Sequence, residues 1–231
     1  MSGVIRLDDP AVLVRLHRSA RARRFTLSLR GGEARLTAPT HARETEARMF
    51  LLRQSDWLRD ALARAPLAHD VVIGAHVLID GASVGIVDSG RARGPCVLCG
   101  GALATPAAAP GAAVAAFLRA RAQASITPAA KAAAAALGRP VGRISFRDTR
   151  SRWGSCTARG DLAFSWRLAM APPAVRDYVA AHEAAHLVEM NHAPAFWRLV
   201  ERLRPDYRAE RAWLRAEGAQ LHRYRFTPAT A

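Results

Sequence analysis

The sequence lacks the features of a membrane or secreted protein. No apolar run in its 231 residues approaches the roughly 18 residues that a membrane span needs, because arginines interrupt every alanine-rich stretch. The amino terminus carries charges where a signal peptide has its apolar stretch. The cysteine count is three, an odd number that argues against a disulfide framework. We therefore expect a cytoplasmic globular protein with no membrane partner.

Lysine and acidic residues are also scarce, so the charge is strongly positive. Lys131 is the only lysine among 34 basic residues, and 19 acidic residues leave a net charge of +15. Such an excess is compatible with nucleic acid or another acidic partner, although the choice of arginine also reflects a compositional habit. An amino-terminal cluster consists of Arg15, Arg18, Arg21, Arg23 and Arg24. This cluster either contacts phosphates or forms a solvated edge of the first hairpin.

The first hundred residues are expected to be mostly β with one helix. Alternating apolar residues around a Gly-Gly pair predict a hairpin over 25–38, and helical spacing predicts a helix over about 43–62. Short strands are expected over 71–73, 76–79 and 83–87. The Gly/Ala/Pro-rich segment 101–111 is the expected hinge. The predicted β-rich amino-terminal region therefore spans 1–100.

The region 112–225 is expected to form a second, mainly helical domain with a small β-hairpin. An alanine-rich helix spans about 112–137, and Thr127–Pro128 either kinks it or begins a second helix. Strands are expected over 144–148 and 162–168, and further helices over about 174–190, 194–203 and 206–221. A turn is expected at Trp153–Ser155, and 226–231 forms a frayed tail. The predicted fold class is α+β.

The sharpest feature is an HExxH sequence, formed by His182, Glu183 and His186, inside the helix expected over 174–190. Residues four apart lie on one helical face with Cβ atoms about 5–6 Å apart, so two imidazoles can bind one Zn²⁺ at about 2.0–2.1 Å each. Glu183 lies about 100° further round the helix, where it misses the metal but reaches a water bound to it. This geometry assigns Glu183 the role of general base.

A catalytic zinc needs three protein ligands and one open position, and His192 is the natural third ligand. Because His192 lies beyond the reach of one continuous helical face, the helix must end and the chain must turn back. The spacing equals that of the metzincin HExxHxxGxxH pattern, but Glu189 stands in place of its glycine. We therefore expect the turn slightly later, at Met190–Asn191, where asparagine tolerates a left-handed conformation.

Several short motifs are dense between about Arg147 and Leu214. They are Arg152-Trp153-Gly154-Ser155-Cys156, Phe164-Ser165-Trp166-Arg167-Leu168, Pro173, Asp177-Tyr178-Val179, His182-Glu183, His186-Leu187, Asn191-His192, Phe196-Trp197 and Pro205-Asp206-Tyr207. As a set they resemble the YgjP-like metallopeptidase family, which is related to the SprT-like zinc proteases. The amino-terminal half resembles the β-rich region of that family more loosely, through the arginine-rich hairpin and the helix that carries Trp57.

The resemblance implies a zincin-like metallopeptidase domain with one Zn²⁺ per chain and a protein or peptide substrate. His182, His186 and His192 match the metal ligands of the family, and Glu183 matches its catalytic glutamate. Ala184 departs from the usual leucine, which affects packing rather than chemistry. The implied reaction is peptide-bond hydrolysis by a zinc-activated water.

The roles of Tyr178 and Arg152 stay open, and so do two alternative functions of the protein. Tyr178, four residues before His182, and Arg152 are candidates for contacting the substrate or the developing oxyanion, although Tyr178 also suits a packing role. One alternative is a DNA-associated, SprT-like protease whose basic surface recruits substrate. The other is a non-enzymatic nucleic-acid-binding domain with structural zinc, in which Cys156 joins His192 to complete the ligand set.

The remaining cysteines form a Cys96-x-x-Cys99 pair flanked by glycines. This spacing equals half a zinc knuckle, but a knuckle needs a second pair and only Cys156 is left. We interpret the pair as a chance occurrence in a loop, and Cys156 as a small buried residue that supports the metal-site loop.

Overall fold

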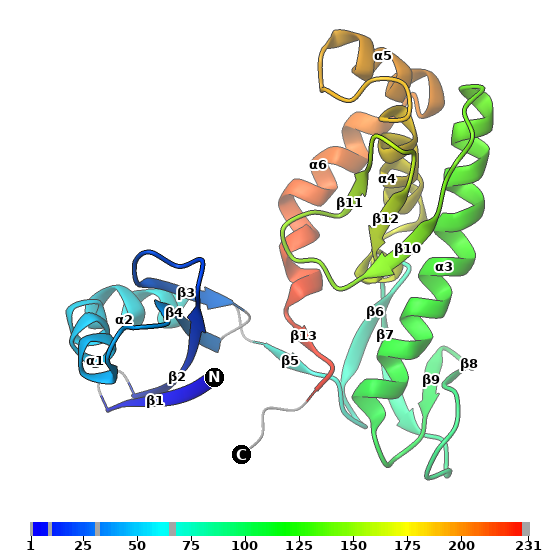
Figure 1. Ribbon diagram of the computed structural model, residues 1–231. Coiled ribbons are helices and arrows are strands. Elements are labelled where there is room, and N and C mark those ends of the chain that lie inside the picture. Colours follow the sequence, from blue (N-terminus) through cyan, green and yellow to red (C-terminus); the bar gives the residue numbers. More distant parts are fainter. Residues whose placement is uncertain (1, 9–10, 31–32, 65–67, 228–231) are drawn as a thin grey trace. The chain divides into compact units, whose positions relative to one another are not determined.

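The computed structural model describes residues 2–8, 11–30, 33–64 and 68–227 (Figure 1). Both helices and strands are present, which confirms the α+β class. The chain divides into two compact units, Met1–Ala68 and His69–Ala231. The segment 101–111, expected as a hinge, instead lies inside the second unit. There Leu103 and Thr105 are fully buried in strand β9 (Ala102–Thr105), because this small-residue stretch packs into a core.

The first unit is a four-stranded sheet with two helices. Its strands are β1 (Ser2–Asp8), β2 (Ala11–Ser19), β3 (Thr26–Arg30) and β4 (Glu33–Pro39), in the order β1-β2-β4-β3. The predicted hairpin is the β3–β4 pair. The sequence reasoning missed β1 and β2, which pair antiparallel with each other, while β2 pairs parallel with β4.

The one helix expected over 43–62 is two helices, α1 (Glu44–Arg53) and α2 (Ser55–Arg64). Gln54 ends α1 with its N–H bonded to the carbonyls of Phe50 and Leu51. The break allows Leu51 and Leu58 both to reach the buried face of the sheet, where each is fully buried. Packing against the sheet therefore overrides the continuous helical pattern.

The second unit contains the remaining elements. Its strands are β5 (His69–Asp70), β6 (His76–Ile79), β7 (Ala82–Asp88), β8 (Val97–Cys99), β9, β10 (Ile144–Arg147), β11 (Gly154–Cys156), β12 (Leu162–Ser165) and β13 (Tyr224–Arg225). Its helices are α3 (Pro110–Ala136), α4 (Pro173–Ala185), α5 (Pro194–Leu203) and α6 (Tyr207–Glu217), with 3₁₀ helices over Trp166–Met170 and Gly218–His222. The strands form sheets in the orders β6-β7-β9-β8, β10-β12-β11 and β13-β5.

Several expectations for this unit need correction. Residues 71–73 form no strand, since β5 ends at Asp70. The strands expected over 144–148 and 162–168 pair parallel, as β10 and β12, rather than as a hairpin. The expected turn at Trp153–Ser155 largely belongs to strand β11, which pairs antiparallel with β12. Phe226, expected in the tail, packs edge-on against Trp166 at 5.0 Å, and the last part of that tail lies outside the described residues.

Helix α3 is continuous through Pro128, despite the cost of about 3 kcal/mol that proline carries inside a helix. One buried stripe with four-residue spacing runs along it, formed by Val114, Leu118, Ala122, Ile126 and Ala130. The stripe packs against α4 and the first 3₁₀ helix, which Figure 1 shows beside it. Within the described part of the chain, no helix is both long and apolar enough to cross a membrane.

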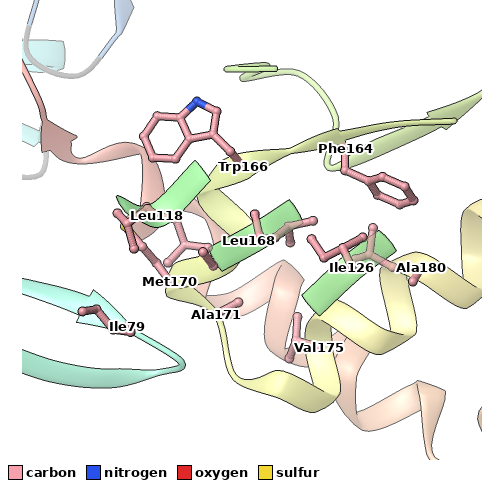
Figure 2. Close-up of a cluster of buried hydrophobic side chains, with 14 of the residues drawn as sticks. Ile79, Leu118, Ile126, Phe164, Trp166, Leu168, Met170, Ala171, Val175 and Ala180 are labelled. Atoms are coloured by element: carbon pink, nitrogen blue, oxygen red, sulfur yellow. The ribbon is translucent and has the colours of Figure 1, made fainter. Parts of the chain in front are cut away.

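The core of this unit lies where α3 meets α4 (Figure 2). Leu118 and Ile126 of α3 point toward Leu168 of the 3₁₀ helix and Val175 and Ala180 of α4, all of them buried. Burial of this kind contributes about 25 cal/mol for each Å² of apolar surface. This packing holds α4, the helix that carries the HExxH residues, against the rest of the unit.

An ion-pair cluster ties the β6–β7 turn to the same two helices. Asp80 has a positive φ of 53°, and its carboxylate accepts hydrogen bonds from Arg121 of α3 and Arg176 of α4. Only 7% of the Arg176 side chain is exposed. Burial raises the pKa of the Asp80 carboxyl, but the two guanidinium groups outweigh burial, so this pKa lies below its usual value.

We expect Asp80→Ala to lower the free energy of unfolding by roughly 2–4 kcal/mol, because Arg176 would stay buried without its counter-charge. Since the folded pKa of Asp80 is lowered, its contribution is present above about pH 4 and is lost as the pH falls below that value. Urea unfolding followed by circular dichroism measures both effects. Glu201→Ala breaks the exposed pair with Arg208 and should cost less than about 1 kcal/mol. Equal costs in the two variants would show that the Asp80 cluster stabilises the fold no more than an exposed ion pair.

Candidate metal centre

Helix α4 carries two of the three histidines on one face. Pro173 begins the helix, where its missing N–H leaves no intrahelical bond unmade. Because residues four apart share a face, His182 and His186 lie with their ring centroids 5.1 Å apart. Both imidazoles are partly buried, whereas His192, beyond the helix, is exposed.

The structure brings His192 back to the other two histidines. One ring nitrogen from each of His182, His186 and His192 can be chosen so that all three atoms lie within 4.8 Å of one another. Nε2 of His192 and Nε2 of His182 are 3.1 Å apart. Two ligand nitrogens at about 2.0–2.1 Å from a tetrahedral zinc lie about 3.3 Å apart, so the spacing fits a shared metal ion.

The turn that returns His192 comes earlier than expected. Helix α4 ends at Ala185, not near Met190, and His186 is its C-cap residue. The N–H groups of Leu187 and Val188 bond to the carbonyls of Ala184 and Ala185 in a tight turn. The chain then reverses before α5 begins at Pro194. The turn was expected at Met190–Asn191 because asparagine tolerates a left-handed backbone conformation. The helix ends instead in a turn in which His186 keeps ordinary right-handed dihedral angles.

The outer ring nitrogens of two histidines have partners. His186 Nδ1 lies 2.9 Å from the backbone carbonyl of Glu189, which can only accept, so Nδ1 carries the proton. His182 Nδ1 lies 3.5 Å from the hydroxyl oxygen of Tyr178. Contacts of this type orient a metal-binding imidazole and leave the lone pair of Nε2 available to the metal. The Glu189 contact is a backbone one, so no side-chain pattern in the sequence predicts it.

An aromatic wall from α5 encloses the three imidazoles. Phe196 is fully buried, and its ring centroid lies 4.5–4.8 Å from those of all three histidines. Trp197 stacks on Tyr207 and lies 5.8 Å from the ring of His192. Burial and the neighbouring imidazoles lower the pKa of His182 to about 3. A neutral imidazole is the form that binds a metal ion.

Glu183 lies beside the triad and against strand β11. Its side chain is buried, and a Cβ atom added to Gly154 would lie only 2.6 Å from its Cδ atom. The absence of a side chain at Gly154 is therefore what lets the carboxylate lie there. Burial raises the pKa of Glu183 to about 8, and the Arg152 guanidinium opposes this rise. A divalent cation held by the histidines would lower this pKa further.

These residues line a cavity of about 560 Å³, which we call the metal cavity. All of the predicted site residues reach it, namely His182, Glu183, His186, His192, Tyr178 and Arg152. Tyr178 is only 5% exposed, so its hydroxyl meets His182 rather than open solvent. Sequence reasoning did not identify the close approach of Gly154, although its place in the Arg152–Cys156 motif was a signal.

Cys156 also lines the metal cavity but is not close enough to join the triad as a ligand. Burial and the Glu183 and Asp161 carboxylates raise the pKa of its thiol to about 11. Across the described ranges, the three histidines are the only group of three or more His, Cys, Asp or Glu side chains that is spaced to hold a metal. Cys96 is buried and Cys99 exposed around the β8 strand, and neither belongs to such a group.

Three imidazoles that could hold a metal ion and an adjacent carboxylate line one cavity, the arrangement expected of a metal-dependent hydrolase site. The family profile described as YgjP-like, metallopeptidase domain, matches residues 23–217. The chain belongs to this metallopeptidase family, as the sequence motifs predicted.

Among solved structures, the chain is similar to the crystal structure of the metallopeptidase zymogen of Pyrococcus abyssi abylysin, with 22% identity and a TM-score of 0.34. That match covers 39% of this chain and 93% of the other. No curated protein matches the sequence significantly.

We expect Gly154→Ala to displace the Glu183 side chain, because the added methyl group would overlap its Cγ and Cδ atoms. Peptidase activity should fall at least about tenfold while metal content stays unchanged, since no histidine moves. Elemental analysis and a peptide-cleavage assay measure the two effects. Gly85→Ala is the matched control, because its added Cβ meets only ordinary contacts 3.7 Å away. Full activity in Gly154→Ala would show that this close approach has no catalytic consequence.

Proposed function

We propose that the protein is a zinc-dependent peptidase in which His182, His186 and His192 hold one Zn²⁺ and Glu183 is the general base. The observation that carries the proposal is the convergence of three imidazole nitrogens beside a buried carboxylate in one cavity. A set of three imidazole donors suits zinc. The outer contacts of His182 and His186 support the same assignment, because they orient the rings.

The absence of a fourth protein ligand favours a catalytic site over a structural one. Structural zinc sites are closed by four protein ligands, whereas catalytic sites keep one position open. Cys156, the residue that would close the set, is not spaced to do so, and no other His, Cys, Asp or Glu among the described residues is. The non-enzymatic alternative therefore has the weaker support.

When bound, zinc supplies Lewis-acid activation of a water molecule and of the scissile carbonyl group. The Glu183 carboxylate lies where it can accept the proton of the attacking water and later deliver it to the leaving amine. Burial raises the pKa of Glu183, and a divalent cation held by the histidines would lower it, which favours the ionised carboxylate that a general base requires. Phe196 and Tyr178 exclude solvent from one side of the imidazoles.

We assign Arg152 and Tyr178 different roles. Arg152 is exposed and lines the metal cavity, so its guanidinium is available to the substrate or to the developing oxyanion. Tyr178 is buried with its hydroxyl near His182 Nδ1, which favours a role in positioning that imidazole. Burial raises the pKa of Tyr178 to about 12, so the hydroxyl stays protonated at neutral pH.

We expect purified protein to contain about one zinc per chain and His192→Ala to contain much less, because the site would lose a third of its ligands. Glu183→Gln should keep its zinc and lose about 10²–10⁴-fold in peptide cleavage, because the amide cannot accept the proton. Elemental analysis and cleavage of a fluorogenic peptide library test both statements.

The outcomes separate ligand assignment from mechanism. Zinc retained undiminished in His192→Ala would remove His192 from the ligand set. Full activity in Glu183→Gln would remove Glu183 as the base. No metal in wild type, even after zinc is supplied, would overturn the proposed function.

A second proposal is that the first unit recruits DNA-associated substrates. The outward face of its sheet carries exposed arginines at Arg6, Arg15 and Arg35 on three neighbouring strands. Arg15 and Arg35 are direct partners across β2 and β4. A face on which basic side chains gather from neighbouring strands suits the phosphates of a polyanion such as DNA.

We expect duplex DNA to bind at low salt and to stimulate proteolysis. Replacing both Arg6 and Arg35 with Gln should reduce the slope of log affinity against log salt by about 0.9 per lost phosphate contact. Fluorescence anisotropy across a salt series measures this slope. Arg48→Gln, on the helical side of the same unit, removes a charge without touching this face and serves as the control. No DNA binding at low salt would contradict the proposal.

A further inference from the structure

A second cavity, of about 370 Å³, adjoins the metal cavity. It shares the wall formed by Ser151, Arg152, Gly154 and Ser155 with the metal cavity, and it extends to Arg147 and Phe164. We call it the β11 pocket, because strand β11 contributes to both cavities. A group bound in the β11 pocket therefore lies next to the place where peptide-bond hydrolysis would occur.

The polar residues that line the β11 pocket all carry hydrogen-bond donors. They are the two arginines Arg147 and Arg152 and the hydroxyl-bearing Thr149, Ser151 and Ser155. The hydroxyl of Thr149 donates to the Arg152 carbonyl at 2.9 Å and so closes the loop that carries Arg152. The remaining lining includes the ring of Phe164 and no carboxylate.

The carboxylates nearby already accept hydrogen bonds from other residues. Asp148 accepts two hydrogen bonds from the buried Arg167, at 2.6 and 3.2 Å. Asp161 accepts the backbone N–H of Arg143 at 2.8 Å. Within the part of the chain that the structure describes, neither Arg147 nor Arg152 forms an ion pair with a carboxylate, although the Arg152 guanidinium interacts electrostatically with Glu183 across the shared wall. The β11 pocket thus carries two guanidinium groups whose hydrogen-bond donors no described carboxylate occupies.

Arginine binds carboxylates through paired, charge-assisted hydrogen bonds, and serine hydroxyls add further donors. We propose that the β11 pocket binds the side-chain carboxylate of an acidic residue in the substrate, so that the enzyme selects peptides with Asp or Glu near the scissile bond. The inference rests on the proposed peptidase function. The two cavities share a wall and an extended chain advances about 3.3–3.6 Å per residue, so the acidic residue lies within about three positions of the cleaved bond.

Binding and cleavage test this proposal separately. Zinc-loaded wild type is first given a randomised synthetic peptide library, and mass spectrometry maps residue preferences around the cleaved bond. Two peptides that differ only by Glu or Gln at the preferred position are then compared in binding to zinc-loaded Glu183→Gln protein. We expect the Glu peptide to bind about tenfold more tightly and to be cleaved with the same preference by wild type.

Two arginine variants identify the source of the preference. Arg147 lines only the β11 pocket, so Arg147→Gln should reduce the Glu-over-Gln binding ratio to near one, and Arg147→Glu should favour a Lys peptide. Arg159→Gln is the matched control, since this exposed arginine follows β11 but lines neither cavity. Circular dichroism checks that each variant is folded.

Each outcome decides one statement. Equal binding of the two peptides, or a preference that survives both Arg147 substitutions, would overturn the pocket assignment even if hydrolysis is confirmed. A Glu preference in binding that depends on Arg147, without any hydrolysis by zinc-loaded wild type, would support the pocket and overturn the proposed peptidase function.

Discussion

The site depends on bringing a third imidazole to two that already share a helical face. A straight helix cannot do this, so α4 must end before His192, and it ends at Ala185 with His186 as its C-cap. The bond between His186 Nδ1 and the Glu189 carbonyl both closes the turn and sets the tautomer of the ring. Phe196 then contacts all three imidazoles from α5. The turn after α4, the tautomer of His186 and the ring of Phe196 together set the positions of the imidazole nitrogens that could bind a metal.

The position of α4 is in turn set by structure remote from the histidines. Its buried face packs on α3 and on the 3₁₀ helix, and Arg176 near its start is paired with Asp80 in the β6–β7 turn. Strand β11 approaches from the other side, where Gly154 leaves room for Glu183. Burial disfavours charged imidazoles and an ionised carboxylate alike, and a divalent cation held by the histidines would favour the ionised form of Glu183.

The many arginines fall into two physical classes. Buried ones serve the fold: Arg167 bonds to Asp148 and to the carbonyls of Leu221 and Tyr224, and Arg176 bonds to Asp80. Exposed ones such as Arg147 and Arg152 line the cavities. A positive rim around a hydrolytic site raises the local concentration of acidic substrates. Composition alone does not separate these classes, because all of them are arginine.

The sequence by itself determined the α+β class and the placing of the two HExxH histidines on one helical face, because helical periodicity and local spacing are short-range properties. Its motifs also carried the resemblance to the family, which the profile match confirms. It also pointed to His192 and Glu183, which the structure brings into one cavity. Only the tertiary structure decided where α4 ends, that β10 and β12 run parallel, that the units divide near residue 68, and that Gly154 lies against Glu183. Each of these depends on contacts between residues distant in the chain, and local propensity carries no information about such contacts.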